Sequence, residues 1–126
     1  MSRQEHLGAY AKGWQTGDID TIVGSVADGY SFDDPNAGVI PKAGMADYFA
    51  GLKAAVLEAR GGQDDQPFME LSEIVTQDEG DTLTAWCWWS IPGTPFAGAG
   101  LIKAGDDGIR SEVITYHAPP AESQDA

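Results

Sequence analysis

Tyr10 and Asp34 are the two residues of this 126-residue chain whose types and setting best suit acid–base chemistry. Asp34 closes the run Tyr-Ser-Phe-Asp-Asp-Pro at positions 30–35, where an extended alternation ends in two acids and a proline. Side chains alternate between the two faces of a strand, so Tyr30, Phe32 and Asp34 share one face. If the aromatic rings face the interior, the Asp34 carboxyl group does so too, and burial raises its pKa toward neutrality. We therefore expect Asp34 to act as a general base.

Each of these residues also has a structural interpretation. The Asp34 carboxylate can instead cap the following loop by accepting hydrogen bonds from the amides of Asn36 or Ala37. Tyr10 can be a core tyrosine whose hydroxyl is bonded internally. Asp33 points to the opposite face of the strand and is expected to be solvated. The residue pattern leaves both interpretations of Asp34 and of Tyr10 open.

Three helices are predicted in the N-terminal half, because apolar residues recur there at helical intervals. The first begins with the capping-box spacing of Ser2 and Glu5, and the second can be capped by Asp18. The apolar spacing of the second helix extends to Val26, which leaves only a short strand at 30–33. The helices are expected between the residues that can begin and end them, which are Ser2 and Gly17, Asp18 and Gly29, and Pro41 and Gly61.

The hydrophobic period changes from helical to two in the C-terminal half. Strands are expected at about 67–76, 82–91, 96–104 and 109–117, joined by turns that contain glycine. Consecutive hairpins make an antiparallel meander, so we predict an α+β fold with the helices against one face of a curved sheet. Residues 1–117 are expected to form a single domain, and residues 118–126 a disordered tail with nothing to bury.

The composition limits the expected partners. Seven basic and twenty acidic residues give a net charge of −13, which repels phosphate backbones and anionic lipid, so we expect neither nucleic acid nor a membrane as partner. The single Cys87 cannot form an internal disulfide, and the polar N-terminus lacks an export signal, so a cytoplasmic location is expected. Two isolated histidines and the absence of a phosphate-binding glycine loop predict no metal and no cofactor.

Large apolar side chains occupy both faces of the segment 82–91. Trp86 and Trp88 share one face, whereas Cys87 and Trp89 share the other. One face is expected to line a cavity or core, and the other to form a homodimer through the outer face of the sheet. A strand buried within one subunit is the alternative. Cys87 is interpreted as core packing rather than as a nucleophile.

The order helix, helix, short strand ending in Asp-Pro, helix and four strands resembles a known fold. It is that of the cone-shaped α+β family that includes ketosteroid isomerases, SnoaL-type polyketide cyclases, scytalone dehydratase and nuclear transport factor 2. The resemblance covers residues 5–117 and is most specific at 10–35, where a tyrosine stands seven residues before a Gly-Asp pair and an aspartate stands before a proline. It implies a cone-shaped half-barrel in which Tyr10 is the oxyanion-hole tyrosine and Asp34 the catalytic base.

The chain departs from the isomerase pattern at one position. Those isomerases carry a second oxyanion-hole acid, a protonated aspartate, on the penultimate strand. The corresponding position falls near Gly100, and no acid lies between residues 96 and 105. Losing such a donor typically lowers the rate by about two to three orders of magnitude. Glu112 shares a strand face with Tyr116 and can approach the cavity, and His117 can lie at its mouth or on the surface.

Two functions are therefore expected as alternatives. The protein is a cofactor-free isomerase, cyclase or dehydratase that transfers a proton on an apolar carbonyl compound, with Asp34 as base and Tyr10 as donor to the enolate-like oxygen. Alternatively, it is a non-catalytic member of the same fold that binds a hydrophobic small molecule or serves as a dimeric module. The residues expected to line the cavity are Trp14, Tyr30, Phe32, Tyr48, Phe49, Trp86 or Trp88, and Tyr116.

Overall fold

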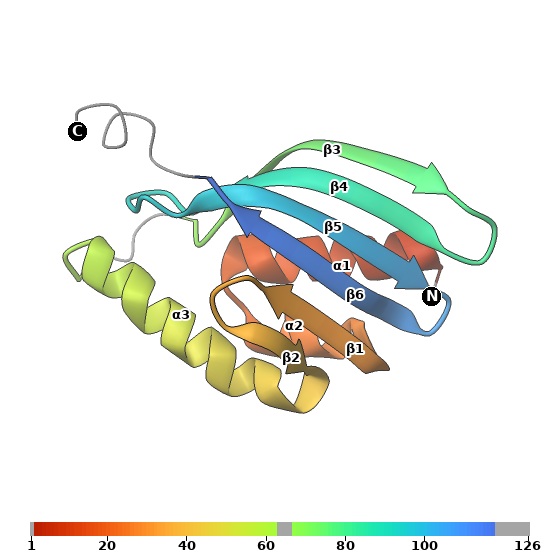
Figure 1. Ribbon diagram of the computed structural model, residues 1–126, viewed down its shortest axis with the longest axis horizontal. Helices are drawn as coiled ribbons and strands as arrows, with labels where there is room; N and C mark the ends of the chain where they lie inside the picture. Colours follow the sequence, from red (N-terminus) through yellow and green to blue (C-terminus); the bar gives the residue numbers. More distant parts are fainter. Residues whose placement is uncertain (1, 63–66, 118–126) are drawn as a thin grey trace.

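The computed structural model describes residues 2–62 and 67–117, and within them the chain forms three α-helices and one six-stranded sheet (Figure 1). The segment 118–126, for which a disordered tail is predicted, lies outside the described residues. The elements are α1 (Arg3–Thr16), α2 (Ile19–Gly24), β1 (Val26–Asp34), β2 (Gly38–Pro41), a 3-10 turn (Lys42–Gly44), α3 (Met45–Ala59), β3 (Glu70–Asp78), β4 (Leu83–Ser90), β5 (Ala97–Gly105) and β6 (Gly108–Tyr116).

The sheet is curved and unclosed, with the strand order β2-β1-β6-β5-β4-β3. Its last four strands form the predicted antiparallel meander. β1, however, pairs with β6 in parallel, so the sheet is mixed rather than wholly antiparallel. α1 crosses one face of this sheet, and α3 lies along the open side near β1 and β2 (Figure 1). The α+β cone expected from the sequence is therefore present.

Strand β1 begins earlier than predicted. The helical spacing of Val26 places it on the second helix, but α2 ends at Gly24 and Val26 pairs with Ile109 of β6. The amide of Ile109 also donates to the Ser25 carbonyl oxygen at 3.0 Å. Sheet pairing therefore overrides the local helical pattern. β2 was also not predicted, because this four-residue edge strand lies in a stretch expected to be loop.

The predicted helix ends are formed as the sequence indicates. The Ser2 hydroxyl accepts from the Glu5 amide while the Glu5 carboxylate accepts from the Ser2 amide, which completes a capping box. Gly17 ends α1 in the left-handed region, at φ 71°. Asp18 then caps α2 by accepting from the amides of Asp20 and Thr21. These caps fix the phase of α1, and thereby place Tyr10 and Trp14 on its buried side.

Alternation along β4 decides which tryptophans face the interior. Cys87 and Trp89 are 3% and 6% exposed and belong to the core, whereas Trp88 is 38% exposed on the outer face beside Trp86. Gly98 of β5 lies against the Thr115 carbonyl oxygen, and a Cβ at Gly98 would collide with it. The glycines of β5 thus allow close approach of neighbouring groups.

Candidate functional site

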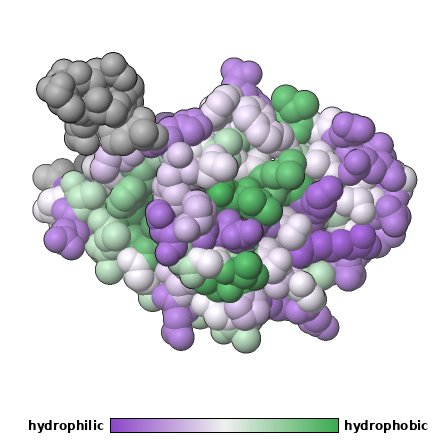
Figure 2. Space-filling view, in the orientation of Figure 1, coloured by the Kyte–Doolittle hydropathy of each residue, from purple (hydrophilic) through white to green (hydrophobic). Residues whose placement is uncertain are grey.

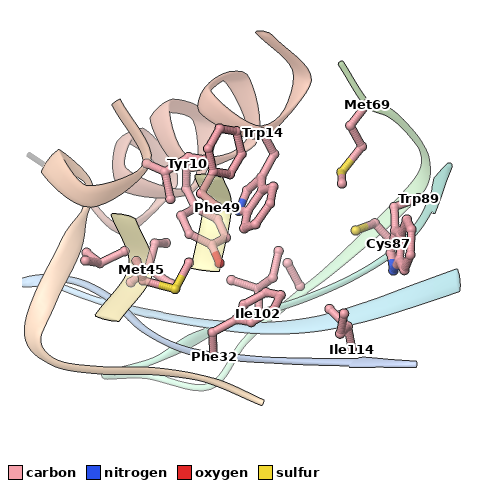
Figure 3. Packing of buried hydrophobic residues seen from close by; sticks show 14 of the residues in the cluster. Tyr10, Trp14, Phe32, Met45, Phe49, Met69, Cys87, Trp89, Ile102 and Ile114 are labelled. Carbon is pink, nitrogen blue, oxygen red and sulfur yellow. The ribbon is translucent and has the colours of Figure 1, made fainter. Parts of the chain in front are cut away.

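A cavity of about 370 Å³ lies between α1 and the inner face of the sheet. Figure 3 shows Trp14 on one side of this space and Cys87 and Trp89 on the other, with Ile102 and Ile114 rising from the sheet. Most of the wall is apolar. Its residues are Tyr10, Ala11, Trp14, Phe32, Asn36, Leu52, Met69, Leu71, Cys87, Trp89, Ile91, Pro95, Phe96, Ala97, Ile102, Glu112, Ile114, Tyr116 and His117.

Glu112 is the only Asp or Glu among the described residues of that wall. Its side chain is 6% exposed, and its Oε1 accepts a hydrogen bond from the Tyr10 hydroxyl at 2.6 Å. Its Oε2 lies against Gly100 of β5, where a Cβ would collide with it. Burial raises the pKa of Glu112 to about 7, although the bond from Tyr10 lowers it in part. The carboxyl group therefore changes charge near neutral pH.

Tyr10 links this carboxyl group to a second phenol. The Tyr10 and Tyr30 hydroxyl oxygens are 2.6 Å apart, and since Tyr10 donates to Glu112, Tyr30 donates to Tyr10. Tyr10 is fully buried, and burial together with the nearby Glu112 carboxylate raises the pKa of its hydroxyl far above the usual value. Burial raises the pKa of Tyr30 in the same way. Both phenols thus stay neutral donors at physiological pH.

Asp34 is 2% exposed but does not belong to the cavity wall. Its Oδ1 accepts from the amides of Asn36 at 2.7 Å and Ala37 at 3.4 Å. Its Oδ2 accepts from the hydroxyls of Tyr48 at 2.6 Å and Tyr116 at 2.8 Å. Burial acts to raise the pKa of Asp34, but these four hydrogen bonds outweigh it and bring the pKa below its usual value.

The structure thus corrects one expectation for Asp34 and confirms another. Its side chain faces inward, as the strand alternation predicts, and it caps the loop at Asn36. The expected rise of its pKa is wrong, because the donors that surround the carboxylate favour its charged form. Tyr10 and Asp34 do not share a ligand in this arrangement, since Glu112 rather than Asp34 bonds to Tyr10.

The predicted lining residues separate into three groups. Trp14, Phe32 and Tyr116 line the cavity. Tyr30, Tyr48 and Phe49 are packed behind that wall, where the two tyrosines support Tyr10 and Asp34. The prediction for Trp86 and Trp88 is wrong, because alternation along β4 turns them to the outer face and presents Cys87 and Trp89 to the cavity.

Several residues of the cavity wall were not predicted from the sequence, or were predicted only as one of two alternatives. The inward face of Glu112 is visible in the alternation with Ile114, but no sequence signal pairs it with Tyr10. Cys87 lines the cavity as a neutral thiol, because burial and the Glu112 carboxylate raise its pKa to about 11. His117 lies at an exposed part of the wall, with its ring 4.9 Å from that of Trp88.

The described ranges 2–62 and 67–117 lack two further features. Within them, no group of three or more His, Cys, Asp or Glu residues is arranged to hold a metal ion. Nor does any helix in this part of the chain have the length and hydropathy needed to cross a membrane.

Solved structures resemble this fold although no protein-family model and no curated protein matches the sequence. A nuclear transport factor 2-like protein of unknown function from Cytophaga hutchinsonii has a TM-score of 0.63 at 12% identity, over 97% of this chain and 96% of that one. A SnoaL-like protein of unknown function from Burkholderia thailandensis has a TM-score of 0.62 at 16% identity, over 92% and 94%. TerC, co-crystallised with polyporic acid, has a TM-score of 0.66 at 15% identity, over 96% and 95%. The chain therefore has the nuclear transport factor 2-like fold.

Proposed function

We propose that this protein, with its nuclear transport factor 2-like fold, binds an apolar carbonyl compound in the cavity and transfers a proton on it without a cofactor. The observation that carries the proposal is the Glu112 carboxyl group, buried in an apolar wall 2.6 Å from Tyr10 and with a pKa of about 7. A group whose pKa lies near the working pH is the most effective general acid or base. TerC, a structural neighbour, was co-crystallised with polyporic acid, which supports the binding of a small molecule by a protein of this fold.

Glu112 is arranged to exchange a proton with a ligand through one oxygen. Oε1 is held by Tyr10, whereas no hydrogen bond to Oε2 is present among the described residues. In the proposed step, Oε2 takes the proton from a carbon next to the carbonyl group, and the C–H electron pair forms the enolate. Return of the proton from Glu112 to another carbon gives the isomer and restores the carboxylate.

Tyr10 keeps the donor role that the family resemblance implies. When Glu112 takes up a proton, its Oε1 becomes a weaker acceptor, so the Tyr10 hydroxyl can donate to the enolate-like oxygen instead. Tyr30 continues to donate to Tyr10 throughout. The Glu112 carboxyl group occupies the space over Gly100 and thus supplies an acid where the sequence alone has none.

Asp34 has a positioning role in this scheme. Its carboxylate accepts from the hydroxyl of Tyr116, a cavity-lining residue, and fixes that part of the wall. Its hydrogen bonds to Tyr48 and Tyr116 cover Oδ2, so direct action of Asp34 as the base requires Tyr116 to move away.

The test compares Glu112→Gln with Asp34→Asn. The assay follows the conversion of cyclohex-3-en-1-one, a β,γ-unsaturated ketone, to its conjugated isomer by ultraviolet absorbance. We expect Glu112→Gln to lose at least about 100-fold in kcat, the usual contribution of a general acid–base group, and Asp34→Asn to lose less than about tenfold. The reverse pattern would return the base to Asp34 and contradict the assignment to Glu112.

A non-catalytic binding function is the second candidate. It is favoured by the closed hydrogen bonding of the resting site, where Asp34 accepts four bonds and Tyr10 already donates to Glu112. If it is correct, ketones bind to the wild type and to Glu112→Gln with similar affinity, and neither protein accelerates isomerisation.

A homodimer through the outer sheet face is also proposed. Val75, Trp86, Leu101 and Val113 lie in register across β3, β4, β5 and β6. Val75, Leu101 and Val113 are 61%, 38% and 45% exposed, and Figure 2 shows hydrophobic patches on the face of the molecule seen in Figure 1. Contiguous exposed apolar surface is typical of an interface.

Sedimentation of the wild type and of Leu101→Asp tests this interface. We expect a dimer that Leu101→Asp converts to a monomer, and that added salt strengthens because each copy carries a charge of −13. A wild-type monomer at every salt concentration would exclude the interface.

A further inference from the structure

We propose that Cys87 is a covalent binding site for neutral, apolar carbonyl compounds with a conjugated double bond, and that Glu112 is the base for this reaction. The reaction differs from the proposed isomerisation, since it forms a bond at a second reactive atom of the same cavity and needs no turnover. The position of the thiol, its neighbour Glu112 and the charge of the wall support it.

The Cys87 thiol faces the cavity. Cys87 belongs to the cavity wall, and Figure 3 shows its sulfur directed toward the space between α1 and the sheet. It is the only cysteine of the chain, so no disulfide within the chain can occupy its sulfur. A small molecule that enters the cavity therefore comes into contact with the thiol.

A carboxylate oxygen lies beside this thiol. Cys87 and Gly100 are directly opposite each other on β4 and β5, and Glu112 Oε2 lies where a Cβ of Gly100 would be. Because opposite Cβ positions are about 5 Å apart, Oε2 is at about that distance from the Cβ of Cys87, and the sulfur is one bond away. Glu112 is only 6% exposed, yet Oε2 accepts no hydrogen bond from the part of the chain that the structure describes. The thiol and this oxygen are thus neighbouring reactive groups in an apolar wall.

The thiol needs this base in order to react. The thiolate is the nucleophilic form, and burial together with the Glu112 carboxylate raises the pKa of Cys87 to about 11. At pH 7.5, a thiol with this pKa is ionised in roughly one molecule in three thousand. The Glu112 carboxyl group, with a pKa of about 7, is mostly ionised at that pH and can take the thiol proton as the bond to sulfur forms.

The charge of the wall favours addition over substitution. Substitution by the thiol, as with an alkyl halide or a disulfide, releases an anion. None of the described residues of the wall is Lys or Arg, so that anion would be buried without a counter-charge. Addition to a conjugated carbonyl compound releases nothing, and its negative charge develops on the carbonyl oxygen. The Tyr10 hydroxyl can donate to that oxygen once Glu112 is protonated.

The step balances in atoms and electrons. A sulfur lone pair forms the bond to the β-carbon of the enone, while Glu112 Oε2 takes the thiol proton. The electron pair of the C=C bond moves to form the enolate, which then takes the proton from Glu112 at its α-carbon. The product is a thioether with the ketone restored, and Glu112 is again a carboxylate. The conjugated ketone formed by the proposed isomerisation is such an enone, so the protein reacts with its own product; this consequence alone rests on the proposed function.

Mass spectrometry of the intact protein, treated with cyclohex-2-en-1-one at pH 7.5, tests the site. We expect one molecule of cyclohexenone to add to each chain, and none to add to Cys87→Ala, which lacks the only thiol. Glu112→Gln should slow the addition at least about tenfold, whereas His117→Gln, at the exposed end of the wall, should leave the rate unchanged. No adduct on the wild type, or an equal adduct on Cys87→Ala, would overturn the proposal.

The pH dependence of the addition identifies the base. Between pH 6 and 8.5, the wild-type rate should level off above about pH 7, where Glu112 is ionised. In Glu112→Gln it should keep rising, by about tenfold per pH unit, because only the thiolate then reacts. The other titratable groups of the described wall are the phenols of Tyr10 and Tyr116, whose raised pKa values keep them neutral in this range, and His117, which the variant above removes. A wild-type rate that rises without levelling would exclude Glu112 as the base.

Iodoacetamide tests the preference for addition, because it is neutral but releases iodide when it reacts with a thiol. Relative to N-acetylcysteine in solution, Cys87 should favour cyclohexenone over iodoacetamide by at least about tenfold. The same preference in the protein and in N-acetylcysteine would overturn the choice of conjugated carbonyl compounds as the ligand class.

These results separate the covalent site from the proposed isomerisation. An adduct on Cys87 without conversion of cyclohex-3-en-1-one would keep the covalent site and exclude the isomerisation. Isomerisation that depends on Glu112, with no adduct on Cys87, would keep the proposed function and exclude the covalent site.

Discussion

Replacing Glu112 by Gln should change how the stability of the protein depends on pH. The folded protein holds the pKa of this carboxyl group at about 7, against an ordinary value of 4.5. The folded state therefore binds the proton more tightly than the unfolded state does. The resulting stabilisation is fully present below pH 4.5, declines as the pH rises, and is lost above pH 7. The difference between the two pKa values corresponds to about 3 kcal/mol.

The assay is urea unfolding of both proteins at pH 5, 6, 7 and 8. Between pH 5 and 8, the free energy of unfolding of the wild type should fall relative to that of Glu112→Gln by about 2 to 3 kcal/mol. Glu70→Gln is the matched control for the removal of one carboxylate, because Glu70 is exposed at the start of β3. Parallel curves for Glu112→Gln would refute the reasoning, since they would mean that Glu112 titrates alike in both states.

Three further substitutions test neighbouring parts of the site. Gly100→Ala places a methyl group against Glu112 Oε2 and should lower the rate of isomerisation at least about tenfold. Gly51→Ala is the control, because the space around a Cβ at Gly51 is open and the rate should stay unchanged. Equal activity of the two variants would contradict the close packing of Glu112 against Gly100. Tyr10→Phe removes the bond that lowers the pKa of Glu112, so the acidic limb of the pH–rate profile should move to higher pH, and an unmoved limb would argue against this bond. Asp34→Asn should lower stability at pH 7 by about 1 to 3 kcal/mol. Because its hydrogen bonds lower the pKa of Asp34, the stability difference between the wild type and Asp34→Asn should shrink as the pH falls below about 4. A stability difference that persists at low pH would contradict the lowered pKa.

Local patterns predicted the helix caps and the inward face of β1 correctly. Ser2, Glu5 and Asp18 bond to backbone groups within three residues, so the local sequence is enough to predict these caps. The same holds for the alternation that turns Asp34 inward. The helix predicted from the spacing of Val26 was wrong, because Val26 pairs with a residue of β6 that lies far along the chain, and this pairing decides its conformation.

The candidate site depends on contacts that sequence spacing does not contain. Tyr10 and Glu112 are 102 residues apart, and they meet only because α1 packs across β6. Gly100 was correctly recognised as a position without an acid, but the carboxyl group of Glu112 on the adjacent strand fills the space above it. The pKa of Asp34 likewise depends on Tyr48 and Tyr116, whose hydroxyls converge on its carboxylate from α3 and β6.

The titration of Glu112 itself tests the account most directly. Carbon-13 NMR of protein labelled at the glutamate carboxyl carbons resolves each glutamate as the pH is raised from 3 to 9. We predict one glutamate signal with a midpoint near pH 7, which is absent in Glu112→Gln and moves to higher pH in Tyr10→Phe. If every glutamate instead titrates near its ordinary value, the carboxyl group is hydrated, and the proposed proton transfer by Glu112 is wrong.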